Sequence, residues 1–512
     1  MKYLNLLPSL LLAILLTGCE KTNKVRENIK EKIVRESYRP TFHFTPQEKW
    51  MNDPNGLVYD KGYYHLFYQY YPDSTVWGPM HWGHAKSKDL LKWEHLPIAL
   101  YPDSLGYIFS GSAVIDKTNT AGFGEGAMVA IFTYHDPVGE KEGSILFQTQ
   151  GIAYSLDDGI TWTKYDGNPV ISNPGIRDFR DPKVFWNVDR ETWQMALVAK
   201  DHVQFYESPN LKDWEKLSDF RFEDTEELGV WECPDLFEMT VEETGDNKWV
   251  LIVSHGAGAP NGGSGTRYFV GDYDGTTFST NQKSSQWIDF GTDNYAGVTY
   301  NNTPDGRRIF IGWMSNWAYA ITTPTIKWRS AMILPRELEL VGSDGQYALK
   351  TPLVKEFEDI LKTVNSEDLG GNPPLSFNYP ELQQSKISFE ITTLKSFKII
   401  LSNDSDEEYF INYDHENAKF LIDRSNSGLV NFSPKFTNPS PQIMPVGELK
   451  EIQLDMVLDA SSIEIVLNNG SYVVTNQIFP SEPYTNFEIQ GVDKNEIANF
   501  RLHKVLKAVS TN

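Results

Sequence analysis

One turn pattern recurs along the first half of the chain and most constrains its fold. Each copy has a serine, a turn that carries aspartate, and a tryptophan that leads into a polar strand. The copies are Ser87 to Trp93, Ser155 to Trp162 and Ser208 to Trp214, and their tryptophans lie 69 and 52 residues apart. This spacing fits one four-stranded blade with loop insertions, so the repeat predicts a β-propeller, and about 300 residues at that period give about five blades.

The sequence between Pro40 and about residue 345 supports this prediction. Almost no segment there repeats apolar residues with the 3.6-residue period of a helix, whereas short alternating runs are bounded by Gly, Asn, Asp and Pro. Many short strands with turn signals between them are typical of a sandwich, a barrel or a propeller. We assign residues 40–345 to the propeller. Its strand-like runs include Tyr63 to Tyr70, Ala127 to Tyr134, Trp193 to Ala199, Trp249 to Ser254 and Arg308 to Met314.

A second all-β domain is predicted for residues 376–512. Alternating runs such as Ile387 to Thr392 and Ile463 to Leu467 continue there between Asn- and Asp-rich turns, without the serine–aspartate–tryptophan pattern. Such a pattern over this length is typical of a β-sandwich. We expect residues 346–375 to link the two domains, with a helix over Val354 to Val364 and the breaker-rich run Gly370 to Pro374.

The first 19 residues are interpreted as a targeting signal and excluded from fold reasoning. Lys2 precedes the apolar run Leu6 to Leu16, which is short for a membrane span, and the run ends in a segment that resembles the lipobox of bacterial lipoproteins. By that resemblance, cleavage leaves Cys19 as a lipidated N-terminus in the bacterial cell envelope, on the periplasmic or the outer face. Residues 20–39 are charged and predict a tether. The other cysteine is Cys233, so an acylated Cys19 leaves no intramolecular disulfide.

The charge balance argues against one class of partner. With 46 Lys and Arg against 69 Asp and Glu, the net charge is −23, which would repel the phosphates of a nucleic acid. A neutral sugar is compatible with this charge. Aromatic residues make up 13% of the chain, which suits both an all-β core and carbohydrate binding.

Four similar segments carry candidate functional residues, and successive segments are separated by about the length of one blade. Each puts a polar or acidic residue at the start of a strand: Trp50 to Gly56, Phe109 to Ser112, Phe179 to Phe185 and Trp231 to Phe237. The residues in question are Asp53, Ser110, Asp181 and Glu232, which lie 57, 71 and 51 residues apart. Because the innermost strand of each blade faces the propeller axis, we expect the three acids to converge at one mouth of the channel.

These four segments resemble, in order, those of glycoside hydrolase family 32, the invertase, inulinase and levanase family of β-fructosidases. The likeness covers about residues 40–505 and includes Asp423 to Gly428, Asp459 to Glu464 and Ile478 to Pro480 in the C-terminal domain. The resemblance implies a five-bladed β-propeller followed by a β-sandwich. It also implies a retaining β-fructofuranosidase that releases fructose from the ends of levan or inulin, and from sucrose.

Residue by residue, the resemblance implies Asp53 as nucleophile, Glu232 as general acid/base and Asp181 as stabiliser of the transition state. The chemistry agrees, because hydrolysis through an oxocarbenium-like state needs one carboxylate to attack and another to donate a proton. We interpret Arg180 as helping to keep Asp181 ionised. Cys233 is interpreted as packing beside the acid in the substrate site, since no histidine partner for a catalytic thiol is marked.

The resemblance also assigns the substrate contacts. Contacts to fructose are expected from Asn52, Gln69, Trp77, Phe109, Ser110 and Arg180, and Trp50 and Trp313 are candidates for an apolar wall. We assign His81, His84 and His255 structural roles. No ligand spacing of a metal site is present, and the mechanism needs no cofactor.

Other functions are kept open at this stage. A non-catalytic, fructan-binding surface lipoprotein would use the aromatic residues and the anchor, but has no need of the three acids. An inverting, five-bladed arabinan hydrolase would need a wider separation of its carboxyl groups, about 6.5–9.5 Å. An endo-acting levanase or inulinase, the preference for β2,1 or β2,6 linkages, and a monomeric or dimeric state also remain open. The export signal and the acidic charge disfavour an intracellular sucrose-phosphate hydrolase.

Overall fold

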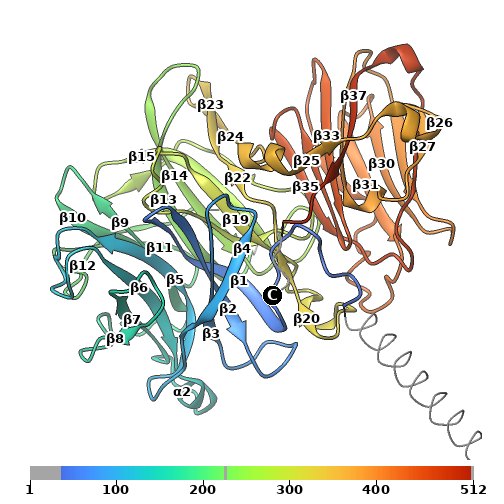
Figure 1. Ribbon diagram of the computed structural model, residues 1–512. Helices are drawn as coiled ribbons and strands as arrows, with labels where there is room; N and C mark the ends of the chain where they lie inside the picture. The colour runs from blue at the N-terminus through green and yellow to red at the C-terminus, as the bar shows by residue number, and fades with distance from the viewer. Residues whose placement is uncertain (1–35, 224–227, 509–512) are drawn as a thin grey trace, which may run out of the picture.

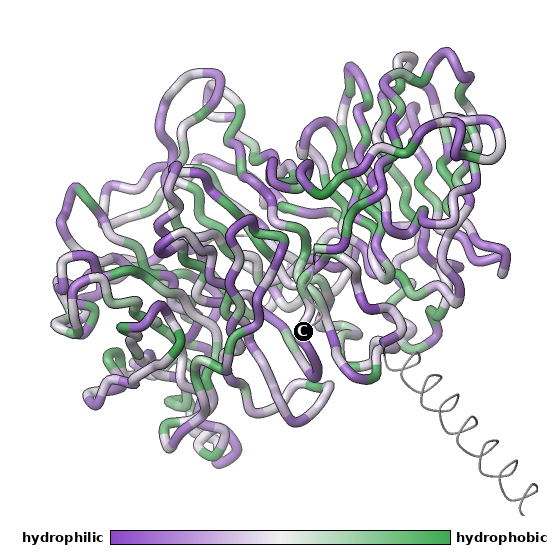
Figure 2. The backbone as a smooth tube through the Cα atoms, viewed as in Figure 1, coloured by the Kyte–Doolittle hydropathy of each residue, from purple (hydrophilic) through white to green (hydrophobic). Residues whose placement is uncertain are grey.

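The computed structural model describes residues 36–223 and 228–508. The predicted signal with Cys19, and most of the predicted tether 20–39, lie outside these residues. The described chain forms a propeller of β-sheets, drawn from blue to yellow in Figure 1, and a two-sheet domain, drawn from orange to red. Many hydrophobic residues lie in the interior of both domains, and many hydrophilic ones lie on the outer loops (Figure 2). No helix of the described residues is long and apolar enough to cross a membrane.

The first three blades are antiparallel sheets whose strands follow chain order. Blade 1 consists of β1 (Lys49–Asp60), β2 (Tyr63–Tyr71), β3 (His81–Ser87) and β4 (Trp93–Leu100). Blade 2 consists of β5 (Tyr107–Asp116), β6 (Ala127–His135), β7 (Gln148–Ser155) and β8 (Thr163–Lys164), with the short helix α2 (Pro137–Lys141) between β6 and β7. Blade 3 consists of β9 (Phe179–Asn187), β10 (Thr192–Ala199), β11 (Val203–Ser208) and β12 (Glu215–Phe220).

Two further sheets complete the propeller. Blade 4 has β13 (Trp231–Thr240), β14 (Asn247–His255), β15 (Gly265–Tyr273), β16 (Phe278–Ser279) and β17 (Gln286–Trp287). Blade 5 has β18 (Tyr295–Thr299), β19 (Ile309–Met314), β21 (Ala331–Met332) and β22 (Arg336–Glu337), with η1 (Ala320–Thr322) in a loop. The inner strands β1, β5, β9, β13 and β18 contact one another in sequence, and β18 contacts β1. The ring is therefore closed, and β20 (Trp328–Arg329) also pairs with β1 in parallel.

The recurring turn pattern lies in one place on successive blades. It joins the third strand to the fourth in blades 1, 2 and 3, and its serine hydroxyl accepts a hydrogen bond from the backbone two residues on. Asp89 and Asp157 then accept backbone N–H groups of the same turn, and Asn210 does so in blade 3. These side chains fix the turn, which is why the pattern could be recognised in the sequence.

The C-terminal domain packs two sheets around an apolar core. One sheet has the order β25 (Leu361–Thr363), β37 (Ile497–Val505), β28 (Ser385–Ile391), β33 (Ile452–Asp459), β34 (Ser462–Leu467) and β35 (Tyr472–Gln477). The other has the order β26 (Gly370–Asn372), β27 (Ser376–Asn378), β36 (Asn486–Gln490), β29 (Phe397–Ser402), β30 (Glu408–Asp414), β31 (Lys419–Asn426) and β32 (Gln442–Pro445). Short 3₁₀ turns η3 (Ser366–Asp368), η4 (Leu382–Gln384) and η5 (Lys494–Glu496) connect strands.

The range 346–375, expected as a linker, contains more structure than the sequence indicated. It holds β24 (Gln346–Lys350), which forms a hairpin with β23 (Glu339–Ser343), as well as β25 and β26 of the two sandwich sheets. The expected helix over Val354 to Val364 is a 3₁₀ helix, η2 (Lys355–Ile360), followed directly by β25. Strands of three residues are too short to show the alternation of apolar and polar residues that marks a strand in the sequence. The sequence therefore predicts a linker for this part of the chain.

A buried charge network joins the two domains. Arg336 of the propeller pairs with Glu464 of the sandwich, and His43 lies 2.8 Å from both Glu464 and Asp459. Burial opposes a charge on His43, but hydrogen bonds with Asp459 and Glu464 raise its pKa to about 9. A second pair, Arg424 with Asp293, lies 2.6 Å apart. Because unpaired buried charges are costly, this network fixes how the domains dock.

Candidate active site

A pocket of about 300 Å³ opens at the propeller mouth where the inner strands begin. Most of the residues predicted from the sequence line it: Asn52, Asp53, Gln69, Trp77, Phe109, Ser110, Arg180, Asp181 and Glu232. Each comes from the first half of an inner strand or, for Gln69 and Trp77, from the neighbouring strand and loop of blade 1. The pocket therefore gathers residues that are more than 50 residues apart in sequence.

Irregular backbone at the start of each inner strand aims these side chains inward. The pairing register shifts between Met51 and Pro54 in β1, and equivalent shifts occur in β5, β9, β13 and β18. Asp181 and Cys233 also have positive φ, 66° and 45°, which is uncommon for residues other than glycine. β-Bulges of this kind turn a side chain away from the regular alternation, and they are frequent beside active sites.

Asp53 is held by hydrogen-bond donors on both carboxylate oxygens. Ser110 Oγ donates to its Oδ2 at 2.6 Å, and Asn52 Nδ2 donates to its Oδ1 at 3.0 Å. The indole Nε1 of Trp50 in turn donates to Asn52 Oδ1 at 2.7 Å, which sets the orientation of that amide. Burial raises the pKa of Asp53, the Ser110 hydrogen bond lowers it and the nearby Glu232 raises it, with a net increase.

Glu232 lines the same pocket but has different hydrogen-bond partners. Arg180 Nη2 donates to its Oε1 at 3.0 Å, and the hydroxyl of Tyr295 donates to its Oε2. Arg180 also pairs with Asp178 at 2.7 Å, whereas its Nε lies 3.9 Å from Asp181. The sequence interpretation linked Arg180 to Asp181, but in the structure its short contacts are to Glu232 and Asp178.

Asp181 shares the neighbour Cys233 with Asp53. The backbone N–H of Cys233 donates to its Oδ2 at 3.0 Å, and the Cys233 thiol lies 3.7 Å from the same oxygen and 3.6 Å from Asp53 Oδ2. Burial raises the pKa of Asp181 to about 7, with Glu232 and Asp53 adding to the rise and Arg180 opposing it. Burial and the same three carboxylates raise the pKa of the Cys233 thiol, so Cys233 is a protonated donor beneath the pocket.

The tryptophans are placed differently from the predicted wall. Trp50 and Trp313 are fully buried, with 0% exposure, and lie behind the pocket rather than on it. Trp317 lines the pocket instead; its ring stacks on that of Trp50 with centroids 6.0 Å apart and packs at a tilt against that of Trp313, 4.9 Å away. Trp231 packs in the core of blades 3 and 4, not beside the Glu232 carboxyl, because adjacent residues of a strand point to opposite faces.

Two further aromatic side chains, Trp77 and Phe109, line the pocket. Trp77 is 40% exposed and contacts the edge of Phe109, which stacks on His135 with ring centroids 4.2 Å apart. The other pocket-lining residues that the sequence did not single out are Glu140, Phe147, Gln148 and Asp178. They come from the segments around α2 and β7 and before β9, where no repeat marks them.

Exchanging Asp181 for asparagine should stabilise the fold at alkaline pH while impairing catalysis. The unfolded chain releases this proton near pH 4, but the folded chain releases it only at about pH 7, so stability falls as pH rises between these values. We expect Asp181→Asn to raise Tm by about 2 °C at pH 8 and to have little effect at pH 4. Calorimetry at both pH values checks this, with the exposed Asp246→Asn as control. An equal shift at both pH values would contradict it.

The described residues contain no group of three or more His, Cys, Asp or Glu that could hold a metal ion. Of the histidines predicted to be structural, His84 and His255 are buried and His81 is half-buried. His84 stacks on Phe67 with ring centroids 4.0 Å apart. The pocket contains two carboxyl groups whose hydrogen-bond donors differ. A hydroxyl and an amide orient one of them, and a guanidinium and a phenol orient the other. A pair of carboxyl groups flanking one pocket is the arrangement that glycoside hydrolases use. A five-bladed propeller with this site defines the class: a glycoside hydrolase.

Comparisons with known proteins agree with this class. Residues 43–352 match the glycosyl hydrolases family 32 N-terminal domain, and residues 352–504 match the C-terminal domain of the same family. A levanase from Bacillus subtilis is 45% identical over 497 residues, which cover 93% of this chain and 72% of the levanase. The chain belongs to glycosyl hydrolase family 32.

Solved structures show the same architecture. An exo-inulinase from Aspergillus awamori superposes with a TM-score of 0.82 at 34% identity, covering 92% of this chain and 99% of the inulinase. A β-fructofuranosidase from Schwanniomyces occidentalis, solved with fructosyl-erythritol, gives a TM-score of 0.80 at 32% identity, covering 93% and 99%. The five-bladed propeller followed by a sandwich, expected from the sequence, is confirmed.

Proposed function

We propose that the chain is a retaining β-fructosidase that releases fructose from the ends of fructans such as levan or inulin, and from sucrose. The observation that carries this proposal is the placement of Asp53 and Glu232 in one pocket with distinct hydrogen-bond partners. Relatives named levanase, exo-inulinase and β-fructofuranosidase support the fructosyl substrate. A pocket at the channel mouth, closed below by buried polar groups, favours a chain end over an internal segment.

In the first step, Asp53 attacks the anomeric carbon of the fructosyl unit as the bond to the leaving oxygen breaks. Glu232 gives its proton to that oxygen, so the leaving sugar departs as an alcohol and a covalent fructosyl–Asp53 ester remains. The donors Ser110 and Asn52 hold the attacking carboxylate in one orientation, which reduces the entropy lost on reaching the transition state.

In the second step, the ionised Glu232 takes a proton from water, whose oxygen attacks the same carbon. The ester to Asp53 breaks, fructose leaves, and both carboxyl groups return to their starting states. Asp181 accepts hydrogen bonds from sugar hydroxyls while positive charge develops on the ring. Trp77 and Trp317, which line the pocket, offer apolar faces to the sugar.

A product time course on sucrose, levan and inulin tests the proposal. Fructose should be the first product from all active substrates, and the relative rates would give the linkage preference. Early oligosaccharides would mean endo cleavage and overturn the exo assignment. Polymer binding without any product would overturn the enzymatic assignment and favour the surface-binding alternative.

We also propose that the protein is anchored through a lipid on Cys19. The support is the sequence alone: a positive start, a short apolar run and Leu16-Thr17-Gly18-Cys19. A polymer such as levan is too large to diffuse freely into a cell, so an envelope location suits an enzyme that acts on it. Replacement of Cys19 by serine should release the protein from the membrane fraction, whereas continued membrane association would contradict the anchor.

A further inference from the structure

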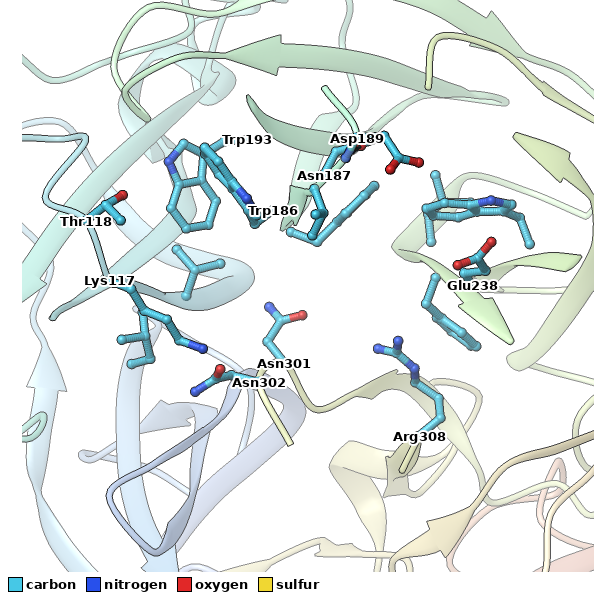
Figure 3. A pocket seen from close by; sticks show the side chains of 17 residues that line it. Lys117, Thr118, Trp186, Asn187, Asp189, Trp193, Glu238, Asn301, Asn302 and Arg308 are labelled. Carbon is cyan, nitrogen blue, oxygen red and sulfur yellow. Dashed lines mark hydrogen bonds between the residues drawn. The ribbon is translucent and has the colours of Figure 1, made fainter. Parts of the chain in front are cut away.

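A second and larger cavity opens at the other mouth of the propeller. All inner strands begin at the catalytic pocket, so their last residues meet at the opposite mouth. There the ends of β5, β9 and β13, together with the chain after β18, surround a cavity of about 610 Å³ (Figure 3). The volume lies in the range of small-molecule sites, about 300–1,000 Å³. From Asp181 to Trp186 the strand β9 spans about 17 Å.

Buried polar groups separate this cavity from the catalytic pocket. Lys183 lies 3.1 Å from Asp235, and the Asp235 carboxylate accepts hydrogen bonds from the backbone and hydroxyl of Thr299. Below them, Asn301 Nδ2 donates to the carbonyl groups of Ala113 and Val184 and ties two inner strands together. The channel is thus filled, and the cavity is a separate site rather than an extension of the first.

Aromatic side chains form part of the cavity wall. Trp186 is 37% exposed and packs edge-to-face on the buried Trp193, with ring centroids 5.0 Å apart. Trp249 packs 5.8 Å from Phe185 on the adjacent blade. Exposed indole faces held by packing from behind are surfaces on which a sugar ring can stack.

The polar groups of the cavity offer both donors and acceptors. The Arg308 guanidinium lies over the ring of Phe237, 4.6 Å from its centroid, and points into the cavity (Figure 3). Within residues 36–223 and 228–508 no group accepts a hydrogen bond from this guanidinium, whose Nε is buried. Lys117 lines the same cavity, as do the carboxylates of Asp189 and Glu238.

We propose that this cavity binds a neutral oligosaccharide, namely an internal stretch of the fructan whose ends the catalytic pocket hydrolyses. This choice of polymer rests on the proposed function. Two cationic and two anionic side chains line the cavity, so it has no preference for a charged ligand, and a phosphate or carboxylate would meet Asp189 and Glu238. Hydroxyl groups satisfy donors and acceptors alike. Binding here holds the polymer while successive ends reach the catalytic pocket.

Affinity electrophoresis of the full chain in gels that contain levan or inulin tests this binding. All proteins carry Asp53→Asn, so that the polymer is not consumed. Adding Trp186→Ala should weaken retention about tenfold, because a tryptophan in a binding site often contributes that much. Arg308→Lys, which keeps the charge but loses the planar donors, should weaken it in the same direction. The exposed apolar Leu429→Ala, on the C-terminal domain, should not.

A reciprocal variant separates the two sites. Trp77→Ala alters the catalytic pocket only, so retention should persist in that variant and fall with Trp186→Ala. Retention that falls only with Trp77→Ala would overturn the inference. Fructose release from sucrose by the chain with Asp53 intact tests the proposed function independently. If no fructose appears but Trp186→Ala still abolishes retention, the binding site stands and the proposed activity does not.

Discussion

Asp53→Asn should lower the rate of fructose release by about 10⁴-fold or more, with the fold unchanged. The amide has the same shape as the carboxylate but cannot form the covalent ester. Asn52 Nδ2 and Ser110 Oγ both donate to Asp53, so one of them must face the new amide nitrogen. The serine hydroxyl can rotate to accept instead, which makes the substitution well tolerated.

Initial rates on sucrose and levan measure this effect, and thermal unfolding checks the fold. Asp60→Asn is the matched control, because Asp60 lies on the same strand, β1, at its other end and outside the pocket. Asp53→Ala is a second variant that cannot revert to aspartate by deamidation. Activity within tenfold of the parent in both Asp53 variants would remove Asp53 from the role of nucleophile.

The propeller was predictable because its repeats are local. The serine–aspartate–tryptophan turns fix the connection between two strands with their own side chains, and so they recur at the same connection in blades 1, 2 and 3. The acids are also predictable as a group, because equivalent strands of a ring must begin at the same mouth. The hydrogen bonds within the group are not predictable in this way, since Arg180 of blade 3 reaches Glu232 of blade 4, a contact that the spacing of the motifs does not encode.

The aromatic wall could not be assigned from the sequence for a related reason. Trp313 and Trp317 are four residues apart, and only the strand end after Met314 decides which of them faces the pocket. Trp50 is buried and donates a hydrogen bond to Asn52. Both residues belong to the same motif, but the sequence alone does not show that their side chains are in contact. Similarly, Tyr295 reaches Glu232 from blade 5, and none of the four motifs marks this tyrosine.

Glu232→Gln should reduce turnover of sucrose and fructans by about 10²–10⁴-fold. Glutamine can still accept from Tyr295 and still contact Arg180, so the pocket keeps its shape but has no proton to give. The loss should depend on the leaving group, because a sugar alkoxide needs protonation and an aryl oxide with low pKa does not. In the bond-breaking step, the variant should therefore lose much less activity toward an aryl β-fructofuranoside than toward sucrose.

This dependence separates an acid/base role from a structural one. Glu140→Gln is the matched control. Glu140 lines the same pocket, 3.1 Å from His135, but is not one of the three predicted catalytic acids. Its effect should be small and equal for both leaving groups. If Glu232→Gln slowed both substrates equally, Glu232 would act by positioning Arg180 and Tyr295, and the proton donor would have to be sought elsewhere. With Asp181 held at a pKa of about 7, it would be the next carboxyl group to test.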